Sequence, residues 1–205
     1  MRVAILGAAA EELAEVGFDR TTLANVASRA STSIGNVYKY FSGKDELFEA
    51  TVPASVASDL SRLLRARVEA LGDAREVDAL PDGHPYRSTS AELFGFALAH
   101  RPVILFLLAH AERTRYAGFA DEIAGELTKL AIGYVGRAYP GLALSASDRR
   151  SLGRLYRSFV VSLASCLREE RSAPALERAV AQLSTYHLAG LGALFEAAAS
   201  KQGGS

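Results

Sequence analysis

The sequence predicts an all-α protein with a small N-terminal domain and a larger C-terminal one. Hydrophobic residues make up 49% of the chain, and they recur at the spacing of helix faces along most of its length. The alternation of apolar and polar residues that marks a half-buried strand is scarce. A length of 205 residues allows a small domain and one larger helical domain with its own core. We place these domains at residues 1–48 and 49–200, followed by a flexible tail at 201–205.

The first two helices are predicted from a glycine and a capping residue. The first helix should end at Gly17, because a glycine followed by a hydrophobic residue, here Phe18, is typical of a helix C-cap. The next helix should begin after Thr22, a favourable N-cap residue. Its apolar residues follow the spacing i, i+3, i+4 and i+7, which buries one face; these residues are Leu23, Val26, Ala27 and Ala30.

A third short helix is predicted immediately afterwards. The link from Ser31 to Ser33 is short enough to join two helices at a steep angle, and either Thr32 or Ser33 can cap the second of them. The apolar spacing of the second helix is repeated, which again predicts one buried face, at Ile34, Val37, Tyr38 and Phe41. For Tyr38, core packing and an outward position are equally open.

The opposite face of this third helix is polar in an unusual way. It carries hydrogen-bonding groups rather than the mixture of Glu and Lys typical of a solvated face, namely Ser33, Asn36, Lys39 and Tyr40. Gly35 leaves room for a phosphate backbone to approach closely. The two short helices therefore have the pattern of a helix-turn-helix whose second helix enters the DNA major groove.

Charge is distributed unevenly in this region. The whole chain has 23 basic and 23 acidic residues, yet no acidic residue lies between Thr21 and Lys44, where Arg29 and Lys39 add further positive charge. Local positive charge favours binding to phosphates. Residues 1–50 nevertheless hold more acidic than basic side chains. We therefore expect the acids of the first helix to face away from DNA, and the affinity for DNA to be modest and sensitive to salt.

Residues 1–50 strongly resemble the N-terminal domain of the TetR/AcrR family of bacterial transcriptional regulators. The resemblance rests on many residues at fixed spacing, including Gly17-Phe18, Thr21-Thr22, Val26-Ala27, Gly35-Asn36-Val37-Tyr38, Tyr40-Phe41 and Lys44-Asp45-Glu46-Leu47-Phe48. The chain departs from the family at Ser31, where the family usually has Gly, and at Ile34, where it often has Lys, Arg or Pro. It also begins almost at the first helix, so we expect it to lack the basic arm that family members commonly carry.

The resemblance implies which residues contact DNA. They are Thr22, Thr32, Ser33, Gly35, Asn36, Tyr38, Lys39, Tyr40 and Lys44. We assign base reading to Asn36, which can pair with adenine, and to Lys39, which can reach guanine acceptors. The tyrosine hydroxyls, Thr22 and Lys44 suit phosphates.

A long fourth helix is predicted from about Lys44 to about Leu71, beginning with a capping box between Ser42 and Asp45. Pro53 should kink it. Because this helix would join the two domains, its bend could shift with the state of the larger domain; a static kink is equally open. Residues 72–88, with two Pro and two Gly, are predicted to form a loop.

The segment from Pro102 to Ala109 is apolar on all sides, which predicts a helix surrounded by others. In the TetR/AcrR family, which the N-terminal residues resemble, the larger domain commonly holds a small-molecule pocket between such helices. Our candidates for its lining are Phe94, Leu105, Phe106, His110, Arg113 and Tyr116. The alternatives are an ion pair with Glu112 or a neighbouring acid for His110 and Arg113, and plain core packing for the hydrophobic candidates.

The last two predicted helices, Asp148 to Glu170 and Ala175 to Ala199, are long, amphipathic and rich in small residues. Family members usually form dimers through these two helices, which implies an interface that includes Val160, Val161, Ala164, Ser165, Tyr186, Ala189, Gly190, Ala193 and Leu194. The alternative is that this face packs only within its own chain.

An enzyme is disfavoured by the inventory of motifs. The sequence has no paired-cysteine metal spacing, no His-Glu-x-x-His, no phosphate-binding glycine loop and no Gly-x-Ser-x-Gly. The four histidines are scattered and the single Cys166 has no intrachain disulfide partner. We expect neither a cofactor nor a metal. No signal-peptide pattern or apolar run long enough to span a bilayer occurs, so we expect a cytoplasmic protein without a membrane partner.

Together these features predict a homodimeric, sequence-specific DNA-binding transcriptional regulator. We expect it to act as a repressor that a small molecule releases from an inverted-repeat operator on double-stranded DNA. The alternative is a DNA-binding protein without a small-molecule ligand, controlled by a protein partner or acting architecturally.

Overall fold

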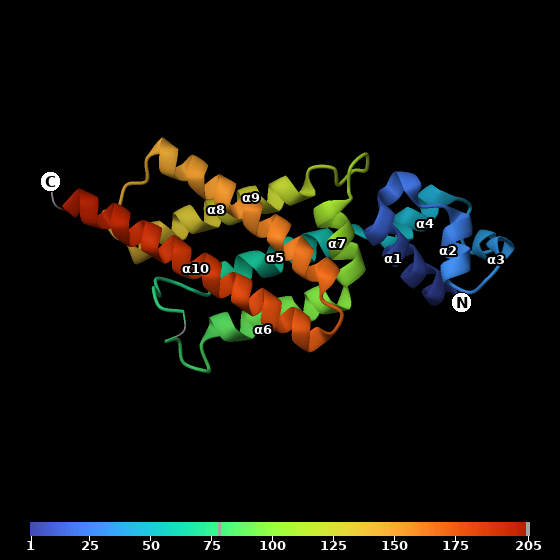
Figure 1. Ribbon diagram of the computed structural model, residues 1–205, viewed down its shortest axis with the longest axis horizontal. Helices are drawn as coiled ribbons and strands as arrows, with labels where there is room; N and C mark the ends of the chain where they lie inside the picture. Colours follow the sequence, from blue (N-terminus) through green and yellow to red (C-terminus); the bar gives the residue numbers. More distant parts are fainter. Residues whose placement is uncertain (78, 204–205) are drawn as a thin grey trace. The chain divides into compact units, whose positions relative to one another are not determined.

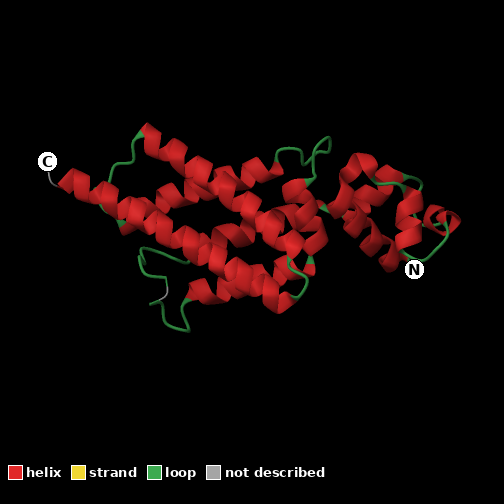
Figure 2. Cartoon of the chain, viewed as in Figure 1, coloured by secondary structure: helices red, strands yellow, loops and turns green. Residues whose placement is uncertain are grey.

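The computed structural model describes residues 1–77 and 79–203, and all regular secondary structure within them is helical, as the sequence predicted (Figure 2). The helices are shown in Figure 1. In chain order they are α1 (Arg2–Arg20), α2 (Leu23–Arg29), α3 (Ile34–Tyr38), α4 (Lys44–Thr51), α5 (Ala54–Glu69), α6 (Pro85–Ala99), α7 (Arg101–Ala109), α8 (Phe119–Ala138), α9 (Ala146–Glu169) and α10 (Ala173–Gly203).

The chain divides into two compact units. The first contains Met1–Asp59 together with Ala99–Ala120, and the second contains Leu60–Leu98 together with the chain from Asp121 onward. This division differs from the predicted boundary after residue 48, because α7 and the loop after it belong to the first unit. The physical reason is that α7 is apolar on all sides and packs against α1.

The first unit has two neighbouring groups of buried side chains. One joins α1 to the two short helices and α4; it consists of Ile5, Ala8, Ala9, Val26, Ala27, Val37, Phe41 and Leu47. The other is centred on Phe48, whose ring centroid lies 4.9 Å from that of Phe18, 5.7 Å from that of Phe106 and 6.5 Å from that of Tyr116. These rings connect α1, α4, α7 and the loop after α7.

Gly17 is a kink in α1 rather than the predicted helix end. Its backbone adopts φ 76° and ψ 173°, and helical structure resumes to Arg20. A side chain at this position would be strained by the positive φ, and its Cβ would lie 3.4 Å from the carbonyl oxygen of His110. The position therefore requires glycine for its backbone angle, whereas a Cβ there would make only ordinary van der Waals contact with His110.

The predicted long fourth helix is two helices. Val52 between α4 and α5 has φ −117° and ψ 70°, because a residue before proline is disfavoured in the helical region and Pro53 has no N–H to donate. The predicted capping box between Ser42 and Asp45 is also wrong. The backbone N–H and the hydroxyl of Ser42 both donate to Glu46, each at 2.7 Å. These hydrogen bonds lower the pKa of Glu46, with that of the backbone N–H contributing most.

The second unit contains α6, α8, α9, α10 and the C-terminal part of α5, and α9 packs against α10. The chain after α5 is fastened to α8 by three hydrogen bonds that end on backbone carbonyls: Tyr134 Oη to Ala74 O (2.8 Å), Arg75 Nε to Ala138 O (2.7 Å) and Arg137 Nε to Gly72 O (3.0 Å).

Two predicted boundaries in this unit change. The loop predicted at residues 72–88 ends earlier, because α6 begins at Pro85, a residue favoured in the first turn of a helix. The tail predicted to be flexible from residue 201 is helical as far as Gly203, and residues 204–205 lie outside the described residues. Among the described residues no single helix is long and apolar enough to cross a membrane; α6 and α7 meet those criteria only when taken together across the break between them.

His187 on α10 is packed between two aromatic rings of α9. Its ring centroid lies 4.8 Å from that of Tyr156 and 4.5 Å from that of Phe159. The Nε2 atom is buried and has no hydrogen-bond partner among the described residues. Burial, and secondarily the positive charge of Arg67, lowers the pKa of His187 to about 4 from an ordinary value of 6.5. The imidazole is therefore neutral at pH 7.

This lowered pKa predicts a loss of stability in mild acid. Between pH 6.5 and about 4 the unfolded chain binds a proton at His187 that the folded chain does not, so stability falls as the pH falls through this range. We expect this group to account for a loss of about 1–2 kcal/mol, reduced from the full value because the ring is partly exposed. Urea unfolding at pH 7 and pH 4.5 should show a smaller loss for His187→Phe than for the wild type. Equal losses would contradict the assignment.

Gly17→Ala should destabilise the protein by about 1–2 kcal/mol, because alanine is strained in the left-handed region. The matched control is Gly7→Ala on the same helix, where a Cβ meets nothing within 4 Å. That change should stabilise α1 by about 0.5–1 kcal/mol, since glycine in a helix costs backbone entropy. Chemical denaturation of the two variants tests the pair, and effects of the same sign would contradict this account.

Candidate nucleic-acid interface

The helix-turn-helix is built from local capping and two buried anchors. The hydroxyl of Thr22 accepts a hydrogen bond from the N–H of Asn25 at 3.1 Å, and that of Ser33 accepts one from the N–H of Asn36 at 3.3 Å. These caps begin α2 and α3 where the sequence predicted. Val37 is fully buried in the core beneath α3, and Phe41 just after the helix is buried beside it.

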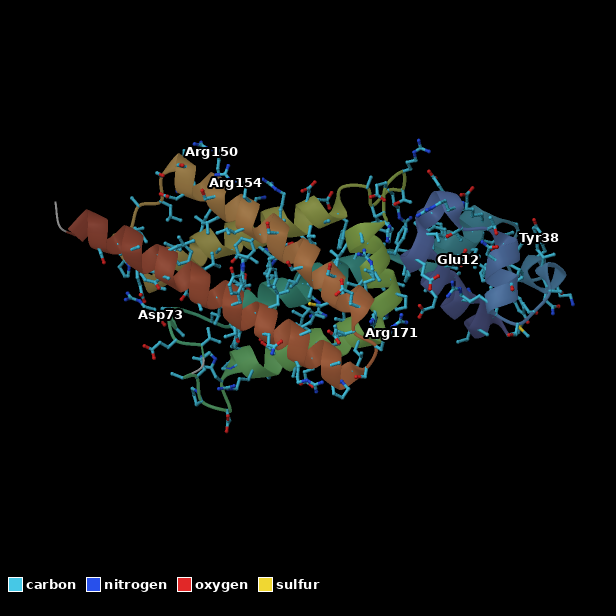
Figure 3. All side chains as sticks on the ribbon, viewed as in Figure 1. Glu12, Tyr38, Asp73, Arg150, Arg154 and Arg171 are labelled. Carbon is cyan, nitrogen blue, oxygen red and sulfur yellow. The ribbon has the colours of Figure 1, made fainter. Side chains whose placement is uncertain are left out.

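The predicted buried face of α3 is only half correct. Ile34 is 45% exposed and Tyr38 is 54% exposed, although both follow the same apolar spacing as Val37. The helix has five residues, so it touches the core with one side only, and the positions next to that side remain accessible. Tyr38 projects from α3 at the outer edge of the first unit (Figure 3). The outward alternative for Tyr38 is therefore confirmed.

The turn between α2 and α3 contains a left-handed residue. Ser31 has φ 51°. This left-handed conformation is strained for any L-residue that has a side chain, but not for glycine. The turn is held by hydrogen bonds from the N–H of Ser31 to Ser28 O (3.0 Å) and from the N–H of Thr32 to Ala27 O (2.9 Å). This conformation favours glycine at the position that Ser31 occupies.

All nine predicted DNA contacts are exposed or half-buried. Two of them form a hydrogen-bonded chain with a third: Asn36 Nδ2 donates to Thr32 Oγ1 at 2.9 Å, and Lys39 Nζ donates to Asn36 Oδ1 at 3.0 Å. The two predicted base readers therefore hold each other in place in the free protein. Lys44, proposed for phosphates, donates to Asp19 O at 3.1 Å and lies 4.3 Å above the ring of Phe18.

Arg29 is neutralised inside the first unit. Its guanidinium lies 2.6 Å from Glu15 and 3.1 Å from Glu12, and the pKa of Arg29 is raised, chiefly by the hydrogen bond to Glu15. Glu12 is only 5% exposed, accepts a further hydrogen bond from Asn25 Nδ2 at 2.9 Å, and lies among the helices in Figure 3. These two acids are thus satisfied by α2. The periodicity of α1 could have revealed this network, since Glu12 falls on its buried face beside Leu13.

The predicted ligand-lining residues are divided between the two units. Phe94 belongs to the second unit, whereas the other candidates lie in the first. Leu105 and Phe106 are buried in α7, and a small open hollow of about 10 Å³ beside Phe48 is lined by none of the candidates.

Two polar members of this candidate set, Arg113 and Tyr116, act together with Arg115 to fasten the loop after α7 to α1 and to the end of α4. Arg113 forms an ion pair with Asp19 at 2.9 Å, which is the alternative considered for it, although with an acid of α1 rather than Glu112. The hydroxyl of Tyr116 donates to Val52 O at 3.3 Å, and Arg115 pairs with Glu49 at 2.5 Å. We call Arg113, Arg115 and Tyr116 the clasp.

The predicted dimer residues fall into two groups. Val160 and Ala164 are buried within the second unit, so these two pack inside their own chain. Most of the others are exposed, and Tyr186 reaches 80% exposure. The accessible set on α9 and α10 consists of Val161, Ser165, Tyr186, Ala189, Gly190, Ala193 and Leu194.

A polar group inside the second unit was not anticipated. Arg67 of α5 donates to Ser90 Oγ at 3.0 Å and to the hydroxyl of Tyr86, and its guanidinium lies 4.7 Å from the centroid of that ring. Among the described residues these partners are neutral. An arginine among others in an amphipathic helix gives no signal of such a role, because the sequence pattern is that of a solvated position.

Comparison with known proteins places the chain in a family. Residues 5–51 match the family model described as bacterial regulatory proteins, tetR family. The HTH-type transcriptional regulator BetI of Burkholderia thailandensis is 31% identical over 140 residues, which cover 62% of this chain and 69% of that protein. The chain belongs to the TetR family. This membership confirms the prediction that it is not an enzyme, because the family and these relatives are regulators.

Other matches are shorter or more distant. BetI of Burkholderia cenocepacia (strain HI2424) is 40% identical over 74 residues, and the matched part spans 36% of this chain but only 38% of that protein. A TetR-family transcriptional regulator of Streptomyces coelicolor, known as a crystal structure, is similar over 97% of this chain and 88% of its own, with 20% identity and a TM-score of 0.40.

Replacing Ser31 by glycine should stabilise the protein by about 0.5–1 kcal/mol, since relief of the left-handed strain exceeds the added entropy of the unfolded chain. Ser33→Gly is the control, because Ser33 has φ −87° and glycine relieves no strain there; loss of its cap hydrogen bond to the Asn36 N–H should lower stability slightly. Chemical denaturation should therefore show a rise in stability for the first variant alone. A fall for Ser31→Gly would show that the turn is not strained.

Proposed function

We propose that the protein is a sequence-specific DNA-binding transcriptional regulator. The observation that carries the proposal is the outward surface of α3, where the accessible Asn36 and Lys39 stand on a helix anchored from below by Val37 and Phe41. An α-helix fits the major groove, and amide and ammonium groups match the donors and acceptors of its base edges.

On DNA the hydrogen bond between Lys39 and Asn36 opens or is shared. Asn36 then pairs with an adenine edge, while Lys39 reaches guanine acceptors. Thr22, Tyr40 and Lys44 contact phosphates and set the register of the helix on the duplex. Because Arg29 is already neutralised by Glu12 and Glu15, few cations contribute to phosphate binding. The affinity of a single DNA-binding unit, which we call the head (α1 to α4), is therefore modest.

We further propose that two copies act together. The apolar side chains left accessible on α9 and α10, above all Val161, Tyr186 and Leu194, supply the surface through which a homodimer forms. Twofold symmetry places two heads on an inverted repeat, and two modest contacts then combine into useful affinity. The protein acts as a repressor by occupying promoter DNA, in the cytoplasm where that DNA lies.

Control of DNA binding is proposed to pass through α7 and the clasp. These elements hold the ends of α1 and α4, so a change in the position of α7 alters the head directly. We propose that the controlling signal is a small-molecule effector that releases the repressor. The alternative is control by a protein partner, or an architectural role without a ligand.

The proposal is tested by selecting bound sequences from a pool of random duplexes at two salt concentrations. We expect an inverted repeat to be enriched. Lys39→Ala should weaken binding and change the preferred base at one position of each half-site, whereas Lys44→Ala should weaken all sequences alike and reduce the salt dependence. Thermal melting of both variants checks the fold, since Lys44 also packs on Phe18.

Binding without any enriched sequence would reduce the protein to a nonspecific DNA-binding role. Equal changes of base preference in both variants would overturn the separate roles assigned to the two lysines.

A further inference from the structure

The recognition helix carries two exposed hydrophobic side chains that the proposed DNA contacts leave without a full explanation. Ile34 and Tyr38 are about half exposed and belong to the large hydrophobic residues left on the surface. They are four residues apart on α3, so they lie on the same side of the helix. Single exposed hydrophobic residues are ordinary, but these two lie together on the five-residue helix proposed to enter the groove.

Helical geometry divides the surface of α3 into three parts. Each residue advances about 100° around an α-helix, so Gly35 and Lys39 lie opposite the buried Val37. Asn36 lies on one flank and Ile34 with Tyr38 on the other. One flank therefore offers hydrogen bonds and the other offers an apolar surface. Between them Gly35 has no side chain, so another molecule can approach the backbone of the helix closely there.

The chemistry of the apolar flank restricts what it can recognise. The side chain of Ile34 has no donor or acceptor, so it contributes nothing to a phosphate contact or to the polar code of base edges. In the major groove the apolar feature of the unmodified bases is the C5 methyl group of thymine. The first residues of a recognition helix are those that reach base edges, and Ile34 is the first residue of α3.

We propose that Ile34, flanked by the ring of Tyr38, reads a thymine through its C5 methyl group. Each half-site of the operator then carries a thymine against Ile34, beside the bases contacted by Asn36 and Lys39. This inference rests on the proposed DNA-binding function and adds to it the chemical identity of one recognised base.

The test uses the operator that the random-duplex selection yields. Each thymine of a half-site is replaced in turn by deoxyuridine, which removes only the C5 methyl group. At one position this change should weaken wild-type binding about 3- to 5-fold per half-site, as expected for one buried methyl group. Ile34→Ala should bind the thymine and deoxyuridine duplexes equally well, while its preference at the other positions is unchanged.

Val3→Ala is the matched control, since Val3 is an aliphatic residue of the first unit that is 81% exposed and lies outside the proposed interface. It should keep the wild-type discrimination between thymine and deoxyuridine. The inference is overturned if no thymine is sensitive to loss of its methyl group, or if Ile34→Ala retains the discrimination. Failure to select any sequence is a different result, because it contradicts the proposed function itself.

Discussion

The packing of Phe48 is the interaction on which the first unit depends. Its ring meets Phe18 of α1, Phe106 of α7 and Tyr116 of the clasp, so it joins parts of the chain that are distant in sequence. Burial of one such side chain contributes about 1.5–3 kcal/mol. The helices that carry the helix-turn-helix have their own group of buried side chains, and the contact between Phe48 and Phe106 adds α7 to them. The same contact makes α7 part of any change in the head.

Polar side chains in the first unit are largely engaged with one another. Glu12 and Glu15 neutralise Arg29, Lys44 rests on Phe18, and Asn36 is held by its neighbours. This arrangement fixes the orientation of α2 and α3 in the absence of DNA. It also lowers the number of cations available to bind phosphates. Recognition of DNA therefore depends less on charge and more on shape and base contacts.

The sequence was most informative where structure depends on near neighbours. The caps at Thr22 and Ser33 and the buried positions Val26, Val37 and Phe41 follow from local spacing. Ile34 followed the same spacing and was misplaced, because a five-residue helix has too few turns for periodicity to define its face.

Contacts between distant parts of the chain were beyond prediction. Arg113 pairs with an acid 94 residues away, and nothing in the local pattern selects Asp19 over other acids. The role of α7 was missed for the same reason: its apolar composition predicted burial, but not the unit in which it is buried. Arg67 likewise becomes notable only once α5 and α6 are folded together.

The small number of anchors beneath α3 has an evolutionary consequence. Val37 and Phe41 are constrained by the core, whereas the outward positions other than the cap Ser33 can change with little cost in folding. After duplication of the gene, a copy could acquire new binding sites through substitutions that leave the protein equally foldable. Divergence of regulatory targets in such a protein is then limited by selection on promoters rather than by protein stability.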